Sequence, residues 1–105
     1  MTVIGLSEEK EAVVEAVLSV YGLSRKELKS RTRTNNISQA RFVAWHHMYK
    51  DLGMSLMEVG REFNRHHSDV IYGLKRIEKL KGDSRIVSAR AKKVREILKH
   101  KDIIT

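Results

Sequence analysis

The chain has 105 residues, of which 41% are hydrophobic, and it carries a formal net charge of +8. This length supports one small domain, and the hydrophobic content is enough for a compact core and too high for a disordered tail. The absence of cysteine excludes disulfides and thiolate metal sites, and no apolar run reaches the roughly 18 residues of a membrane span. The start of the chain lacks the basic and apolar stretches of a signal peptide, so we expect a cytoplasmic protein.

The charge is unevenly distributed along the chain. Residues 1–24 carry one lysine against four glutamates, whereas residues 25–105 carry 20 basic and 9 acidic side chains. A segment with a net charge of +11 repels itself unless an anion lies nearby. This excess favours a polyanion as the partner, and a basic protein that is merely soluble is the alternative.

The first third of the chain predicts two helices and a basic loop. Ser7 is a hydroxyl cap followed by acidic residues, and apolar residues then recur at helical spacing. Ser24 and Glu27 have the spacing of a capping box, which predicts a short helix over residues 25–29. Residues 30–37 have no apolar period, so we expect a basic loop there.

The middle of the chain predicts a long helix and then a short one. Ser38 is the expected cap of the long helix, which carries aromatic residues on one face. Ser55 and Glu58 repeat the capping-box spacing, which predicts a short helix over residues 56–63.

The last part of the chain predicts two more helices. His66 or Ser68 opens the first, over about residues 68–80, and Ser84 opens the second, over about residues 85–100. The glycines expected to end helices are Gly22, Gly53 and Gly82. Because no β alternation is visible, the predicted fold class is all-α with about five to six helices.

Two of these predicted helices are close neighbours in the chain. Only residues 64–67 separate the helix over 56–63 from the helix over 68–80. A short helix, a tight turn and an amphipathic second helix form the helix-turn-helix pattern. In this motif the first helix supports the second, whose first turn enters the major groove of duplex DNA.

Polar side chains that can hydrogen-bond to bases or phosphates surround the start of the second helix. The candidate base-reading residues are Arg65, His66, His67, Ser68 and Asp69. Further side chains, on several elements, are candidate contacts to phosphates. They are Arg31, Arg33, Arg41, Lys50, Tyr72, Lys75 and Arg76.

Several of these residues stand in an order typical of one protein family. The matching parts are Tyr21, KELKSRTR at 26–33, Arg41, SLMEVGREF at 55–63, RHHSDV at 65–70 and KRIEKL at 75–80. With them, residues 16–80 resemble the C-terminal DNA-binding domain of DnaA, the bacterial replication initiator family. The resemblance implies double-stranded DNA as the partner. It also implies a role in replication initiation or its control, or in transcription, for a stand-alone protein or an excised domain.

The chain departs from the family pattern at the turn and in the loop. Asn64 stands where the family has two glycines, so the turn is one residue shorter. By position, His67 and Ser68 match the family's base-contacting His and first Thr, whereas Asp69 replaces the second Thr. We therefore do not expect the family's standard initiator box to be the best site. Counted back from Arg41, the minor-groove arginine of the family falls at Asn35, and Arg33 lies two residues earlier, so the loop is also out of step with the family. Both residues are candidates for that role.

Neither nucleotide chemistry nor metal chemistry has support in the sequence. No Gly-x-x-x-x-Gly-Lys-Ser/Thr phosphate loop occurs, so ATP-driven assembly at an origin is beyond this chain alone. Neighbours in the pairs His46–His47 and His66–His67 point about 100° apart on a helix, so we expect no metal site. No arrangement typical of a catalytic centre is present, and we expect neither an enzyme nor a cofactor.

Other side chains have simpler interpretations. Phe42 and Trp45 share a helical stripe and are expected in the core, and three methionines are expected to pack against it. These are Met48, Met54 and Met57. The basic helix over residues 85–100 is a solvated face, a second phosphate contact or a partner surface.

Two rivals to duplex binding remain open. The basic helices can dock an acidic protein or compete with a true initiator, or the domain can bind structured RNA. RNA readers present aromatic side chains for stacking, whereas most of the six aromatic residues here lie on core stripes. We expect one domain over residues 1–105, and a monomer is favoured over an oligomer.

Overall fold

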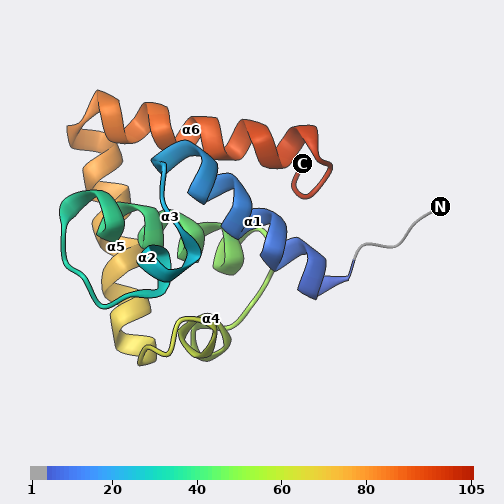
Figure 1. The fold of residues 1–105 in the computed structure, drawn as a ribbon, viewed down its shortest axis with the longest axis horizontal. Helices are drawn as coiled ribbons and strands as arrows, with labels where there is room; N and C mark the ends of the chain where they lie inside the picture. Colours follow the sequence, from blue (N-terminus) through green and yellow to red (C-terminus); the bar gives the residue numbers. More distant parts are fainter. Residues whose placement is uncertain (1–4) are drawn as a thin grey trace.

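The computed structural model describes residues 5–105, which form six helices and no strand (Figure 1). The helices are α1 Leu6–Tyr21, α2 Arg25–Lys29, α3 Asn35–Lys50, α4 Leu56–Glu62, α5 His67–Asp83 and α6 Arg85–His100. The predicted all-α class is confirmed. Residues 1–4, the start of the domain predicted over 1–105, lie outside the described part. Within residues 5–105, no helix is long and apolar enough to cross a membrane.

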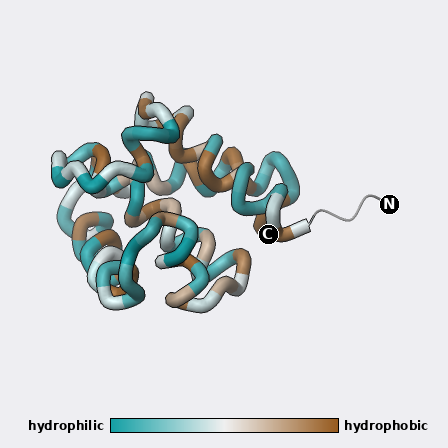
Figure 2. Tube along the Cα trace, turned by 60° about the horizontal axis from the view of Figure 1, so that its bottom comes forward, coloured by the Kyte–Doolittle hydropathy of each residue, from teal (hydrophilic) through white to brown (hydrophobic). Residues whose placement is uncertain are grey.

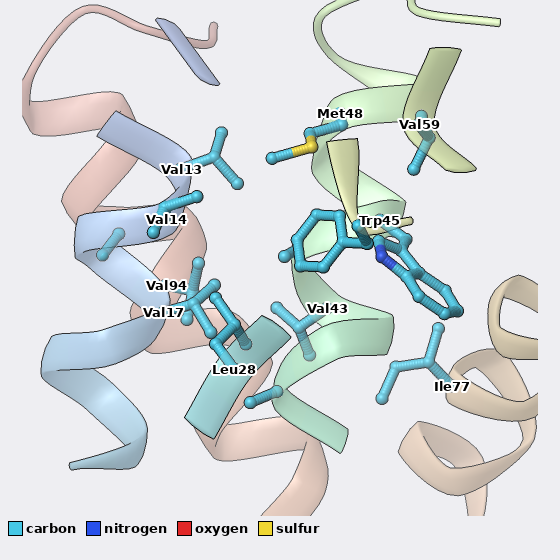
Figure 3. Close-up of a cluster of buried hydrophobic side chains, with 14 of the residues drawn as sticks. Val13, Val14, Val17, Leu28, Val43, Trp45, Met48, Val59, Ile77 and Val94 are labelled. Carbon is cyan, nitrogen blue, oxygen red and sulfur yellow. The ribbon is translucent and has the colours of Figure 1, made fainter. Parts of the chain in front are cut away.

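Helix α3 is the centre of the core. It packs against α1, α2, α4 and α5, and α6 packs against α1 and α5. Trp45 of α3 is 1% exposed, and its ring meets Phe63 edge-on at a centroid distance of 5.7 Å. Figure 3 shows Val13 of α1, Ile77 of α5 and Val94 of α6 around the same cluster. All six helices therefore share one core.

The predictions for the core residues are confirmed with one exception. Phe42 packs against the core, and Trp45, Met48 and Met54 are buried within it. Met57 is 59% exposed, so its predicted packing role is wrong. The reason is its position on the outer side of the short helix α4, whose buried residues are Val59 and Gly60.

Both predicted capping boxes are present. Ser24 Oγ accepts from the Glu27 backbone N–H at 3.2 Å, and the Glu27 carboxylate accepts from the Ser24 N–H at 3.0 Å. Ser55 and Glu58 repeat the arrangement at 3.1 and 3.0 Å. Because isolated short helices are marginal in water, these caps help to fix where α2 and α4 begin.

Three predicted helix limits differ from the structure. Helix α1 begins at Leu6 after Gly5, so Ser7 lies inside its first turn. Helix α3 begins at Asn35, which shortens the predicted loop and places Ser38 inside the helix, where its backbone N–H already bonds to the Thr34 carbonyl.

The third difference is at Gly82. Gly22 and Gly53 adopt positive φ after α1 and α3, as predicted, whereas α5 continues through Gly82 to Asp83. Helix α5 is followed by Ser84, whose Oγ accepts from Val87 N and caps α6 as predicted. Helix α5 therefore ends just before the serine that caps the next helix, and not at the predicted glycine.

Two glycines allow the helix-turn-helix to pack closely. A Cβ at Gly60 of α4 would lie 2.5 Å from the Arg65 carbonyl oxygen, and the Gly60 carbonyl itself accepts from the Arg65 N–H at 2.8 Å. A Cβ at Gly73 of α5 would lie 2.6 Å from the Phe42 ring. Between the two helices, Asn64 adopts a φ of 52°, which closes the short turn. The predicted helix-turn-helix is therefore present, and its second helix, α5, packs closely against α3.

Helix α6 is amphipathic and closes the far side of the fold. Val87, Val94 and Leu98 are buried, whereas most of its basic residues are exposed. In Figure 1, α5 runs from the turn beside α4 up to α6, so the two ends of α5 lie on opposite sides of the molecule. Along the coloured helices of Figure 2, each turn carries both hydrophilic and hydrophobic residues.

Candidate nucleic-acid interface

The start of α5 presents a turn of exposed polar side chains. His66 is the cap residue, and His67, Ser68 and Asp69 form the first turn. All four are exposed, and the neighbouring Arg65 is partly buried. The structure thus brings the five predicted base-reading residues together at one helix end, which we call the reading turn.

His66 fixes the geometry of this turn. Its Nδ1 accepts from the Ser68 backbone N–H at 3.2 Å and lies 2.8 Å from Ser68 Oγ, whose hydroxyl can donate to it. This arrangement suits the neutral tautomer with its proton on Nε2. The rings of His66 and His67 stack at a tilt, with centroids 4.2 Å apart. His66 therefore stabilises the helix start, and His67, which is also exposed, lies beside it.

Arg41 holds the loop that precedes α3. The side chain is only 3% exposed, and its guanidinium donates to the Ser30 carbonyl at 2.8 Å and to the Thr32 carbonyl at 2.6 Å. A third bond reaches Ser38 Oγ at 3.3 Å. Burial, with a smaller contribution from the nearby Arg65 charge, lowers the pKa of Arg41 below its usual value. These bonds make Arg41 a support of the loop backbone.

The same loop is also tied to the reading turn. Arg65 donates to the Ser30 carbonyl at 2.9 Å, and Arg31 donates to the Asn64 carbonyl at 3.4 Å. We call Arg31, Arg41 and Arg65 the arginine latch. Since the latch spans the loop, α3 and the turn, it fixes the position of the loop relative to the start of α5.

A groove lies between the latched loop, the first half of α3 and the outer side of α5. Its lining is Arg33, Asn35, Ser38, Gln39, Arg41, Phe42, Trp45, Arg65, Asp69, Tyr72, Arg76 and Leu80. Four of these residues are arginines and one is an acid. Three lining side chains, those of Gln39, Arg41 and Trp45, each hold a buried polar atom without a partner. A positively charged groove beside the reading turn suits a polyanion.

The remaining predicted contacts divide into two groups. Tyr72, Lys75 and Arg76 are exposed on α5, and Tyr72 and Arg76 line the groove. Lys50 stands at the other end of α3, in a hollow shared with residues 102–105. The structure therefore separates Lys50 from the groove, and we leave it out of the interface.

Asp69 is the acid of this basic region. It occupies the first turn of α5, where an acidic side chain interacts favourably with the helix dipole. It forms no ion pair with any described residue, although Arg33, Arg65 and Arg76 line the same groove. Asp69 thus stabilises the start of α5, and its carboxylate, which lines the groove, has no ion-pair partner among the described residues.

Some residues of the site were not expected from the sequence. Gln39 carries no pattern that would have marked it. Gly60 and Gly73 carried a signal, because a glycine inside a helix costs about 1 kcal/mol relative to alanine and so suggests a packing need.

The second histidine pair lies elsewhere. His46 and His47 of α3 border a different groove, beside α6. Burial lowers the pKa of both imidazoles, and the Asp51 carboxylate, 2.6 Å from His47 Nδ1, partly offsets this for His47. Within residues 5–105, no three His, Asp or Glu side chains gather as metal ligands.

Comparison with known proteins matches the region that holds the helix-turn-helix to one protein family. A family model described as "Bacterial dnaA protein helix-turn-helix" matches residues 10–77, which include α2 to α4 and the reading turn. The matched part therefore contains both the latched loop and the helix-turn-helix.

Individual relatives match the same region. The chain is 35% identical over 78 residues to the chromosomal replication initiator protein DnaA of Thermosipho africanus, covering 74% of this chain and 18% of that protein. It is 38% identical over 69 residues to the initiator of Oleidesulfovibrio alaskensis, covering 66% and 15%. It is 37% identical over 89 residues to that of Thermodesulfovibrio yellowstonii, covering 80% and 20%. The chain thus spans a fifth or less of each relative.

Proposed function

Because the chain belongs to the bacterial DnaA helix-turn-helix family, we propose that it binds double-stranded DNA through the reading turn and the latched loop. One observation carries the proposal: an exposed polar helix start stands beside a groove lined by four arginines. The first turn of a supported helix is the part that reaches base edges in a helix-turn-helix complex. The arginines supply the charge that phosphates require.

The residues divide into three roles in this proposal. The reading turn faces the base edges of the major groove, with His67 and Ser68 as donors and acceptors. Arg33 of the loop and Asn35 at the start of α3 contact the adjacent minor groove or its phosphates. The side chains that contact the phosphate backbone of the duplex from α5 are Lys75, Arg76 and Tyr72. Arg41 positions the loop.

The relatives support a proposal for the biological process. Those matched are named as replication initiators, which supports a role in replication initiation or its control. Transcription regulation is the second process that we propose for the domain. We place the domain at the nucleoid, as one folding unit, and assign it no catalytic step. An acidic protein partner is the rival function, favoured only by the net charge of +8.

A salt titration tests duplex binding. Arg31, Arg33, Lys75 and Arg76 are exposed. Each phosphate contact adds roughly 0.9 to the negative slope of log affinity against log salt, so four contacts give a slope of about −3 to −4. The measurement is a gel shift with random duplex, single-stranded DNA and RNA. A slope near zero on duplex, or stronger binding to RNA or to single strands, contradicts the proposal.

A variant pair locates the contact. Arg33→Ala should lower duplex affinity and reduce the slope by about 1, because one phosphate contact is removed. Its unfolding free energy should stay within about 0.5 kcal/mol of wild type, because Arg33 is exposed and lies outside the latch. Lys93→Ala, which removes the same charge on α6, is the control and should leave the affinity for a single short duplex unchanged. Equal losses in both variants would mean that only net charge matters.

A further inference from the structure

Helix α6 carries a continuous basic stripe on one flank. Arg85, Lys92, Arg95 and Lys99 follow one another at helical spacings of seven, three and four residues, so they point in similar directions. All four are exposed, and none forms an ion pair with a described residue. We call these four residues the α6 stripe. Its charges are therefore available to an external anion.

The stripe borders a groove that adds to its positive charge. Lys92 and Arg95 line this groove together with Lys81 from the end of α5 and with His46 and His47 of α3. Glu78 is the acid at its edge, where it lies 3.7 Å from Lys81 and 3.6 Å from His46. Three other acids lie close by: Asp51 beside His47, Asp83 in a hollow that Arg85 and Lys92 also line, and Glu96 on α6 itself. Cations therefore outnumber acids along the whole flank.

The chemistry of the stripe suits a phosphate backbone. From Arg85 to Lys99 the stripe spans roughly 21 Å, which corresponds to about six phosphates of one duplex strand. The exposed large apolar residue of α6 is Ile86, which lies about 100° around the helix from Arg85. A docked protein needs apolar or aromatic anchors at the centre of its interface, and the stripe offers none. It likewise carries no aromatic platform for stacked single-stranded bases.

The stripe and the reading turn are at opposite ends of α5. Helix α5 has 17 residues, so roughly 25 Å separate its two ends. In Figure 1, α6 lies across the end of α5 that is remote from α4 and the turn. A duplex that receives the start of α5 in its groove therefore lies on the far side of the molecule from the stripe.

We propose that the α6 stripe is a second docking surface, independent of sequence, for the phosphate backbone of another duplex segment than the one at the reading turn. One molecule then bridges two segments of DNA. This goes beyond the proposed function, which needs a single duplex. The bridge uses no base contacts on the α6 side, so it works with any second segment.

A capture assay tests the bridge. One duplex is fixed on beads, a fluorescent duplex is free in solution, and captured fluorescence is measured after the full chain is added at low salt. Wild type should capture the second duplex. The double variant Lys92→Gln with Arg95→Gln should lower capture at least fivefold, while its affinity for a single short duplex stays within twofold. The control Lys93→Gln with Lys101→Gln removes one charge from α6 and one from the residue that follows it, both outside the stripe, and should retain capture.

Each other outcome overturns the bridge. If the stripe variant captures as well as wild type, bridging runs through another surface, such as a protein dimer. If both variants lose capture equally, only net charge acts. If labelled polyglutamate or duplex RNA is captured better than duplex DNA, the occupant is a protein or RNA. If wild type binds one duplex but captures no second one, the stripe proposal fails and the proposed function stands.

Discussion

The two basic regions of this protein are built in different ways. At the start of α5, Arg41 and Arg65 are hydrogen-bonded to loop carbonyls at 2.6–2.9 Å, so the loop and the reading turn hold one fixed geometry. On α6, the cations of the stripe are exposed and form no ion pair within the described chain. Fixed donors distinguish one base from another, whereas free cations respond to any phosphate. In the two proposed roles, arginine and lysine therefore serve a fixed geometry at the start of α5 and unspecific attraction of phosphates on α6.

The largest expected effect is on stability, which should depend on the arginine latch and not on the α6 stripe. Arg41→Ala removes hydrogen bonds to the carbonyls of Ser30 and Thr32 and should destabilise the fold by about 2–3 kcal/mol. For a domain of this size, the melting temperature should fall by about 10–20 °C. The matched change on the stripe, Lys92→Ala, should stay within about 0.5 kcal/mol. Thermal melts of both variants check this. An Arg41 variant as stable as wild type would show that the loop does not depend on the latch.

The second expected effect concerns the acid of the reading turn. If Asp69 accepts from a cytosine amino group, Asp69→Ala should erase discrimination at one base pair, worth about 1–3 kcal/mol, without strengthening the best site. We expect this outcome because an acid among arginines lowers affinity and gains selectivity. The measurement is a set of affinities for all four base pairs at each position of a selected site. A uniform gain on every duplex would remove the base-reading role, and no change would place the reading face elsewhere.

A smaller expected effect is the pH dependence of stability that His47, on the α6 side of the molecule, contributes. Burial lowers the folded-state pKa of His47, so the unfolded chain binds protons more readily, and stability should fall as the pH drops below about 6.5. Asp51 opposes this shift, whereas Arg95 and Lys81 add to it. Urea melts at pH 7.5 and 5.5 should show a loss for wild type that shrinks in His47→Gln. The same loss in both proteins would assign the titration to another group, with His46 the first to test.

The smallest expected effect is on the family's standard site. The sequence resemblance implies a turn at Asn64 that is one residue shorter than in the family, and Asp69 in place of a threonine, so we expect the reading turn to differ from that of the initiators. Affinities for a standard initiator box and for a scrambled duplex of equal length should therefore be similar. A preference of a thousandfold or more for the box would mean that both departures are tolerated.

Local signals made the helices predictable. Capping boxes, serine caps and the φ > 0 glycines depend on residues within a few positions of one another, and Ser24, Ser55, Ser84, Gly22 and Gly53 act as expected. The misplaced starts at Ser7 and Ser38 have different causes. Gly5, which offers no side-chain cap, holds the cap position of α1, so the serine pattern was misleading there. Before Ser38, Thr34, Asn35 and Asn36 are all polar, and the sequence alone does not show which of them leaves the helical conformation first.

Tertiary roles were less accessible from the sequence. The cluster at the start of α5 was predictable because its residues are adjacent in the chain. Arg41 and Lys50 carry the same charge on the same helix, yet one is buried against the loop and the other lies near residues 102–105. That difference arises from the path of the loop and of the C-terminal segment, which no spacing rule encodes.

The most direct test of the account is a selection of bound duplexes from a random library. Three proteins are compared. They are wild type, a reading-turn variant that combines His67→Ala with Ser68→Ala, and an α6 variant that combines Lys92→Gln with Arg95→Gln. The account predicts one enriched motif for wild type, the same motif for the α6 variant, and a changed or lost motif for the reading-turn variant. An unchanged motif in the reading-turn variant, or no enriched motif for wild type, would contradict base reading by the start of α5.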